Sequence, residues 1–535
     1  MHQPKVLTRH DVAALIAAGD TIVINQGLIL RLNGWLDHHP GGRLVIQHMV
    51  GRDATDEISI YHSSKLIQSM SHYRIGRIEG NWVNFTPPIR GGFLAQSTKN
   101  SATEIPTDPI SVHAEQLSQF FSTTTPTLEL SLEDDSPAVQ GPPMTIDNTQ
   151  LVKQALEDDL DQYPSLDAVT QHAIVEKYRN LHQKIKDEGY YDCQYREYAK
   201  EMGRYLCIFT AFLIALRSGW FIISAALLGL FWHQIMFTAH DAGHQGITHN
   251  FVVDTLIGMF IADFCCGLSI GWWKSSHNVH HLVTNHHEHD PDLQNAPLFA
   301  TSPSYLASFH SSYYNFTFLW DKAAEFAIPY QRYTYYPVMG IARFNLYLLS
   351  WCHLLSRRST TLGSSKWTRP TEICFMSIYW FLFGYCLVWR SIPTWPLRIM
   401  FVLVSHIITM PLHVQITLSH WAMSTSDLGE SESFPQHQLR TTMDVECPPW
   451  LDFIHGGLQF QAVHHLFPCV PRHNLRRLQQ LVIGFCDETG IKYKRLGFVA
   501  GNKDVLGKLG EVAAQLELMI KCQKHMAATG ESGLH

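Results

Sequence analysis

The sequence predicts an α+β domain at the N-terminus joined to an all-α, multi-pass membrane domain with about four transmembrane helices. Residues 21–25 alternate as a half-buried strand does, and a second apolar run at 28–32 is followed by turn signals, which together predict the first part. Long apolar runs in the middle of the chain predict the second part. Clusters of His at helical spacing accompany these runs and indicate bound metal.

Length and composition narrow the class of function. The 535 residues suffice for two or three domains, and 16% charged residues is low compared with about 25% in a soluble protein. The net charge of -7 argues against a nucleic acid partner. The 32 His approach the 40 Lys plus Arg in number, which points to metal chemistry. The 11 Cys form no C-x-x-C pair. The first residues contain no continuous apolar run of the kind found in secretory signals, so the first domain is expected in the cytosol.

Changes in composition divide the chain into five regions. Residues 1–85 form the small α+β domain, and residues 86–150 are rich in Pro, Ser and Thr, as a disordered linker is. Residues 151–204 show helical patterning and predict helices at the membrane surface. Residues 205–480 hold the apolar runs and the His clusters, and residues 481–535 are expected to form a cytosolic helical tail.

The first domain is expected to be built around the tetrapeptide HPGG at 39–42, where Pro fixes a turn and two Gly let the backbone approach a flat ligand. HPGG alone is also consistent with a simple turn. With the flanking sequence, the segment resembles the haem-binding core of cytochrome b5. This resemblance implies non-covalent haem b with His39 and His62 as axial ligands, which restricts the haem to electron transfer. His38 and His48 carry no motif and are predicted to lie at the surface.

Five apolar segments bear on membrane topology. Residues 205–237 are long enough for two closely turned spans, and 373–388 and 397–418 predict one span each. The run at 251–270 contains acidic residues and Gly, which favours an interfacial or re-entrant segment, and 345–355 is too short to cross. Even numbers of crossings then place every His cluster and the first domain on the same, cytosolic, face.

Three His clusters repeat one geometry. His240 and His244 are one helical turn apart. The other two clusters have members at i, i+3 and i+4: His277, His280 and His281 in one, and Gln461, His464 and His465 in the other. Side chains so spaced converge on one face of a helix. A lone buried His is usually a core residue whose ring nitrogens have hydrogen-bond partners. About eight His beside membrane spans instead favour a functional role. Eight imidazoles are more than one metal ion can bind, so two metal ions are expected.

The clusters HDAGH, HNVHH and QAVHH, in this order and set against paired spans, resemble the three His boxes of membrane-bound desaturases. The Q-x-x-H-H third box behind a cytochrome b5-like domain is similar to the front-end subgroup. By this resemblance two non-haem irons would be bound by His240, His244, His277, His280, His281, His464 and His465, with His420 in TLSHW as an additional ligand.

For other polar residues near the boxes, the sequence is consistent with two roles. Gln461 stands where many family members have His, and could hydrogen-bond an imidazole or bind weakly through its carbonyl. Asp241, Asp290 and Asp292 could fix His tautomers or cap helices. A structural role is favoured over substrate lining for His233, His406 and His413, and three histidines fall outside the box pattern: His286, His287 and His289.

The resemblance implies an O2-dependent acyl-chain desaturase that draws electrons from its fused haem domain. GGLQFQAVHHLFP, HNVHHLVTNHHEHDPD and FWHQIMFTAHDAGH look most like fungal sphingolipid delta-8 desaturases, which act at C8–C9 of the long-chain base of ceramide. A front-end polyunsaturated fatty-acid (acyl-lipid) desaturase, a hydroxylase with the same diiron site and a membrane-anchored b5-type electron carrier are the alternatives. The implied partners are ceramide or another sphingolipid, O2, membrane lipid and a reductase such as NADH-cytochrome b5 reductase, at the endoplasmic reticulum.

Overall fold

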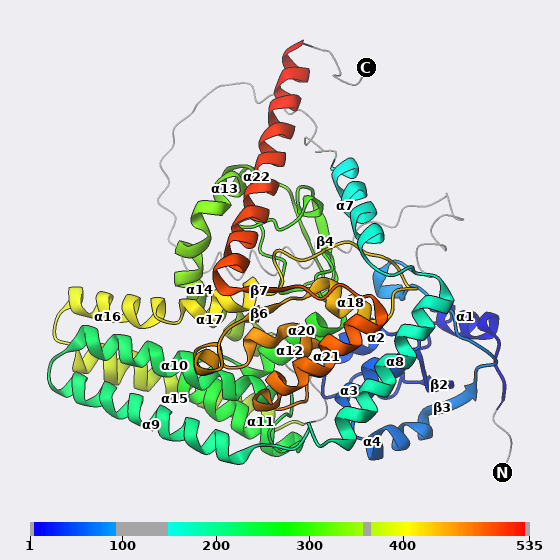
Figure 1. The fold of residues 1–535 in the computed structure, drawn as a ribbon. Coiled ribbons are helices and arrows are strands. Elements are labelled where there is room, and N and C mark those ends of the chain that lie inside the picture. Colours follow the sequence, from blue (N-terminus) through cyan, green and yellow to red (C-terminus); the bar gives the residue numbers. More distant parts are fainter. Residues whose placement is uncertain (1–4, 93–147, 357–364, 530–535) are drawn as a thin grey trace.

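A small N-terminal domain, blue in Figure 1, packs against a larger helical body from which the long C-terminal helix projects. The computed structural model describes residues 5–92, 148–356 and 365–529. Most of the predicted linker, residues 93–147, lies outside the described residues. The two predicted fold classes are thus both present, an α+β domain followed by an all-α domain.

The N-terminal domain combines a three-stranded antiparallel sheet, in the order β1-β2-β3, with short helices. Ile24 of β1 pairs with Ile29 of β2, and both side chains are fully buried, so these strands form one side of the domain's hydrophobic core. The elements are α1 (Arg9–Ala17), β1 (Ile22–Asn25), β2 (Leu28–Arg31), α2 (Arg43–Gln47), α3 (Thr55–Tyr61), α4 (Ser64–Ser69) and β3 (Arg74–Arg77). The exposed position of His38 confirms its prediction. The prediction for His48 is wrong, because that ring is fully buried against the helical body, where it lies 5.4 Å from the ring of His289.

Two helices, α7 (Thr149–Gln162) and α8 (Ala168–Asp187), confirm the helical patterning predicted before the membrane domain. Helix α8 begins at the N-cap Asp167, whose carboxylate accepts from the backbone N–H groups of Val169 and Thr170. Its buried face is mostly apolar, with Gln171 and His182 as the polar members, and packs against the C-terminal part of the chain. This helix therefore lies between the N-terminal domain and the helical body (Figure 1).

The membrane domain is all helical apart from one short hairpin. Its elements are α9 (Tyr195–Arg217), α10 (Phe221–Gly243), α11 (Phe251–Met259), the π-helical turn η3 (Phe260–Cys265), α12 (Ile270–Leu282), β4 (Phe309–Ser311), β5 (Phe316–Phe318), α13 (Lys322–Ala327), α14 (Gln331–Leu355), α15 (Thr368–Trp380), η7 (Phe381–Ser391), α16 (Trp395–Ile407) and α17 (Met410–Leu418). Helix α10 packs against both α9 and α16.

Within the described residues, four helical runs are long and apolar enough to cross a membrane: Phe221–Gly243, Lys322–Leu355, Thr368–Ser391 and Trp395–Leu418. The number agrees with the prediction, but two assignments differ. Helix α9, where the first span was expected, starts with charged residues and is not among these runs by composition, although it packs along α10. The segment 345–355 is longer than predicted, since it ends a 34-residue run, while the prediction that it does not cross is left untested by length and composition.

The connection between the first two His clusters turns sharply. Helices α11 with η3 and α12 are bent by 117° relative to each other, which fits the prediction of an interfacial or re-entrant segment. The rings of α12 and those of the third cluster meet, as described below, so an even number of crossings must separate them. At most two of the three apolar runs between them can then cross.

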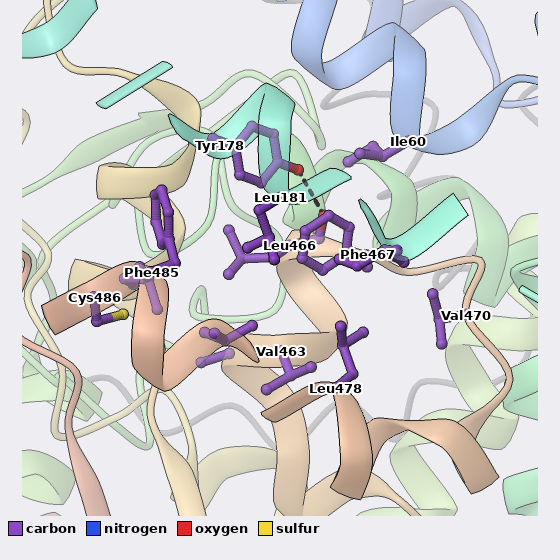
Figure 2. Packing of buried hydrophobic residues seen from close by; sticks show 14 of the residues in the cluster. Ile60, Tyr178, Leu181, Val463, Leu466, Phe467, Val470, Leu478, Phe485 and Cys486 are labelled. Atoms are coloured by element: carbon purple, nitrogen blue, oxygen red, sulfur yellow. Dashed lines mark hydrogen bonds between the residues drawn. The ribbon is translucent and has the colours of Figure 1, made fainter. Parts of the chain in front are cut away.

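The C-terminal part of the chain encloses the third His cluster. Its elements are α18 (Phe434–Thr441), β6 (Asp444–Glu446), α19 (Asp452–His455), α20 (Gln461–Leu466), α21 (Leu475–Thr489), β7 (Arg495–Gly497) and α22 (Phe498–Thr529). Figure 2 shows the apolar cluster in which Tyr178 of α8 lies over Leu466 and Phe467, with Ile60 of the N-terminal domain at its edge. The Tyr178 hydroxyl donates to the Leu466 carbonyl at 2.8 Å, so this buried contact fixes the end of the helix that carries the third cluster.

Candidate functional site

The His clusters lie at the ends of helices that converge. His240 is in the last turn of α10 and His244 follows directly, while α12 carries its three His in its last two turns. The ring of Trp273 packs over Gly243, where a Cβ would lie 2.1 Å from its Cζ3 atom. The absence of a side chain at this position therefore lets α10 and α12 approach closely enough for their rings to meet.

The structure brings seven of the eight predicted ligands into two groups. Within each group, the candidate ligand atoms all lie within 4.8 Å of one another. The first group contains His240, His244, His277 and His464, and the second contains His280, His420 and His465. A further combination of side chains that meets the same distance limit is His277, His280 and Asp292. Residues more than 200 positions apart in the sequence thus converge on two adjacent sites.

The ring nitrogens in these groups fit metal ions. Four Nε2 atoms are buried and have no hydrogen-bond partner among the described residues: those of His240, His244, His464 and His465. The Nδ1 atom of His420 is in the same state. Buried polar atoms almost always have a partner, so several orphaned imidazole nitrogens pointing together indicate sites for borderline metals such as iron.

His281, the eighth predicted ligand, lies among these rings without joining either group. Its ring stacks on that of His465 with 4.1 Å between centroids, and its Nε2 atom lies 3.1 Å from Nε2 of His277. Its buried Nδ1 atom has no partner among the described residues. The geometry places His281 between the two groups, in contact with members of both.

Carboxylates and amides outside the boxes hold several rings in place. Nδ1 of His280 lies 2.7 Å from Oδ2 of Asp290, which is fully buried. Nδ1 of His277 lies 3.5 Å from Asp292. Sequence reasoning missed Gln438 of α18, whose Oε1 atom lies 2.9 Å from Nδ1 of His465 and whose Nε2 donates to a backbone carbonyl at 2.9 Å. A buried Gln in FPQHQLRT carries no motif, so only tertiary structure reveals it.

Asp241 belongs to a second network around the first box. Its carboxylate accepts from the guanidinium of Arg472 and from the Tyr198 hydroxyl, while His240 Nδ1 lies 3.8 Å from it. Arg472 is buried and also pairs with Glu201 of α9. The main role of Asp241 is thus to tie α10 to α9 and to the segment after α20.

The remaining singled-out histidines do not join the metal groups. Three are buried with their own partners or aromatic neighbours, in accordance with a structural role: His233, His406 and His413. Three others stack with one another outside the groups, as predicted: His286, His287 and His289. The side chain of Gln461 is buried and its Oε1 atom has no partner among the described residues.

The N-terminal domain contains the second candidate site. The ring centroids of His39 and His62 lie 6.0 Å apart with the ring planes tilted by 42°, so an atom midway would lie about 3 Å from each centroid. The Nδ1 atoms of both rings lie within hydrogen-bond reach of carbonyl oxygens, at 3.1 Å from Gly42 and 2.9 Å from Ile58, which leaves both Nε2 atoms free. Burial lowers the pKa of His39 to about 4 and that of His62 below its ordinary value, so both rings are neutral, as ligands must be.

A cavity of about 430 Å³ adjoins these two rings, within the range of about 300–1,000 Å³ typical of cofactor sites. Apolar side chains dominate its lining on the N-terminal side, among them Leu30, Val45 and Ile58. A Cβ on Gly41 would lie 2.8 Å from Cε1 of His39, so this glycine is required for the close turn. The residues present fit a bis-imidazole haem.

Comparisons with known proteins identify the family of each of the two parts of the chain. The family model described as Fatty acid desaturase matches residues 218–497, and that of the Cytochrome b5-like Heme/Steroid binding domain matches residues 8–79. The chain is 46% identical to the Delta 8-(E)-sphingolipid desaturase of Emericella nidulans, covering 99% of this chain and 98% of that protein. It is 40% identical to the protein of that name from Candida albicans, covering 97% and 98%. The Acyl-lipid (9-3)-desaturase of Borago officinalis is 36% identical over 55% of this chain and 64% of its own length.

Proposed function

This chain belongs to the fatty acid desaturase family and carries an N-terminal cytochrome b5-like domain, and from that premise we propose that it desaturates C8–C9 of the long-chain base of ceramide. The chain is an oxidoreductase acting on lipids. The observation that carries the proposal is the pair of His groups assembled from all three boxes. The proposed reaction consumes one O2, two electrons and two protons, removes two hydrogens from neighbouring methylenes and yields two waters.

Two irons would occupy the two His groups. Bound iron would supply oxygen reduction and hydrogen abstraction from an unactivated chain, which amino-acid side chains do not provide. The first group offers four imidazoles and the second offers three. Asp290 holds Nδ1 of His280 and Gln438 holds Nδ1 of His465, so each leaves the opposite nitrogen of its ring directed into the site. Burial of these rings excludes bulk water from the reacting centre.

The substrate assignment rests on the relatives. Several fungal relatives named Delta 8-(E)-sphingolipid desaturase cover nearly the whole chain, whereas the acyl-lipid relative covers about half. The third box also reads QAVHH here, while fatty-acyl front-end enzymes typically read QIEHH, so Ala462 and Val463 depart from that pattern. A front-end acyl-lipid desaturase is the second candidate, favoured only by the part of the chain that matches such enzymes.

Electrons would come from haem b held by His39 and His62, reduced by a partner such as NADH-cytochrome b5 reductase. The two candidate sites lie on the same side of the apolar helices, because the N-terminal domain contacts the end of the helical body that carries the boxes. We place both sites on the cytosolic face of the endoplasmic reticulum membrane, where such a reductase and ceramide would be accessible.

Lipid analysis of a yeast that expresses the chain tests the substrate. A new double bond in the ceramide long-chain base supports the proposal. A new double bond in acyl chains of other lipids instead supports the acyl-lipid alternative, and a hydroxylated base would indicate hydroxylase chemistry at the same site.

Two substitutions test the division of labour between the sites. His280→Ala is expected to abolish desaturation and lower the iron content while the haem absorption spectrum remains. His39→Ala is expected to remove that spectrum and most activity while the non-haem iron remains. His310→Ala, on the exposed hairpin strand β4, is the matched control and should change neither. Full turnover by His39→Ala would exclude the N-terminal domain as the electron donor.

A further inference from the structure

The haem cavity is not enclosed by the N-terminal domain alone. Its lining includes residues of the helical body: Gly243, His244, Gln245, Phe251, Lys274, Asn278, Leu282 and Cys469. One of these, His244, belongs to the four-His metal group. A single cavity is therefore lined both by His39 and His62, the proposed axial ligands of the haem, and by His244 of the four-His group.

Contacts across the boundary hold the two domains in this arrangement. Asp56 of α3 accepts two bonds from the guanidinium of Arg179 in α8, at 2.7 and 3.2 Å. At a separate place, Arg52 forms an ion pair with Glu430. Between them, Val279 and Val283 of the helical body are buried in the same apolar cluster as Val45 and other residues of the N-terminal core. The interface thus combines a buried apolar cluster with two ion pairs.

Lys274 is the one Lys or Arg among the described residues that line the cavity. Its side chain is buried, and its ammonium lies 5.2 Å from the ring centroid of Phe251. Asp254 and Glu372 are close enough to act on it electrostatically, but neither forms an ion pair with it. Asp254 already accepts from the backbone N–H and hydroxyl of Thr248, and Glu372 accepts from Ser269 and Gly271.

A buried ammonium without a paired anion is costly. Haem b carries two propionate carboxylates on one edge, and Lys274 lines the same cavity as His39 and His62. We propose that the haem is bound between the two domains, with Lys274 of the helical body pairing with a haem propionate. In this arrangement Lys274 would hold the edge of the haem, and His244 lines the same cavity.

This inference rests on the haem assignment in the proposed function, and the experiment below distinguishes a failure of the Lys274 pairing from a failure of the haem assignment. The full-length protein loaded with haem is used, and two quantities are measured that do not require turnover: the rate of haem loss to excess apomyoglobin and the midpoint reduction potential of the haem. Absence of a haem spectrum in the wild type would contradict the proposed function. An unchanged spectrum with unchanged rate and potential in the variants would contradict only the role of Lys274.

Lys274→Met removes the charge while keeping the length of the side chain. Loss of one charge-assisted hydrogen bond to the propionate is expected to accelerate haem loss about tenfold. The propionate left without its cation also favours ferric over ferrous haem. A tenfold rise in the equilibrium ratio of ferric to ferrous haem lowers the midpoint reduction potential by about 59 mV for one electron. Lys274→Arg is expected to retain most of both properties. Lys200→Met, an equal charge change on the exposed face of α9, is the control and should match the wild type.

A second perturbation keeps the test decisive if Lys274→Met does not fold. The double variant Arg179→Ala with Glu430→Ala removes both ionic contacts between the domains and changes no residue that lines the haem cavity. Undocking then separates Lys274 from the propionate, so haem loss should accelerate and the potential should fall as in Lys274→Met. If both measurements stay at wild-type values in the undocked variant, or in a folded Lys274→Met, the proposed pairing is wrong.

Discussion

Asp290→Asn gives a sharp test of how the iron ligands are positioned. Three groups donate to this fully buried carboxylate: His280 Nδ1 at 2.7 Å, the backbone N–H of Asn285 at 2.8 Å and that of Asp292 at 2.9 Å. An Asn carbonyl can replace the first two acceptor contacts. Its amide group then faces the third N–H, so one buried donor is left without an acceptor, at a cost of about 1–3 kcal/mol.

The substitution also removes the charge that opposes His280. A neutral hydrogen bond is roughly half as strong as a charge-assisted one. Loss of a partner that orients a metal-binding His typically lowers metal affinity about 10–100-fold, or about 1.4–2.7 kcal/mol. We therefore expect Asp290→Asn to lose iron from the group that contains His280 and to lose most desaturation.

The assay is the ratio of iron to haem after equilibration with a chelator, together with lipid analysis of the expressing yeast. The haem absorption serves as an internal measure of folded protein. Asp427→Asn is the matched control, since Asp427 lies 3.4 Å from Nε2 of His286, which belongs to neither metal group. If Asp290→Asn kept its iron at chelator concentrations tolerated by the wild type, and its turnover stayed within about twofold, the positioning role would be refuted.

Two further predictions concern the packing and the ion pairs around the site. Gly243→Ala places a methyl group against Trp273 and should reduce iron content and activity at least tenfold. Gly203→Ala in α9 is the control: the added Cβ has no atom of another segment within 4 Å, so the variant should be neutral or more stable by up to about 1 kcal/mol. Iron analysis and thermal melting in detergent distinguish the two variants. Burial alone would raise the pKa of Glu432, but the guanidinium of Arg440 outweighs burial and lowers this pKa from an ordinary 4.5 to about 2. The stability that the pair contributes to the fold is therefore complete above pH 4.5 and is lost as the pH falls toward 2. Glu432→Gln should cost about 3 kcal/mol at neutral pH and flatten the pH dependence of the melting temperature below pH 5; a variant that melts at the wild-type temperature throughout would contradict this.

The features that could be predicted from the sequence are those encoded locally. Spacing of i, i+3 and i+4 on a helix makes His277 and His280 converge whatever the rest of the chain does, so the box residues were accessible to pattern reasoning. The HPGG turn is equally local. The number of apolar runs long enough to span a membrane was also predictable, because hydropathy sums over about 20 neighbouring residues.

What could not be predicted depends on contacts between distant segments. His48 looks like a surface residue because nothing in its neighbourhood reveals that the helical body covers it. Gln438 lies in no motif, yet it holds His465. The run that ends at 355 was missed because Arg343 breaks its apolar pattern; in the fold this guanidinium is buried, donates to the Tyr347 hydroxyl and lies 4.4 Å from the ring centroid of Trp232.

The meeting of the His groups constrains the membrane topology more strongly than hydropathy does. Composition alone allows Lys322–Leu355, Thr368–Ser391 and Trp395–Leu418 each to cross. Three crossings would put the ring of His280 and that of His465 on opposite faces, yet their centroids lie 4.9 Å apart. Near the start of the first run, Gln331 is fully buried and donates to the backbone carbonyl of Leu509 in the C-terminal helix. This contact places the start of the run beside the body that surrounds the metal groups, and because the rings on both sides of the three runs meet, at least one of the three does not cross.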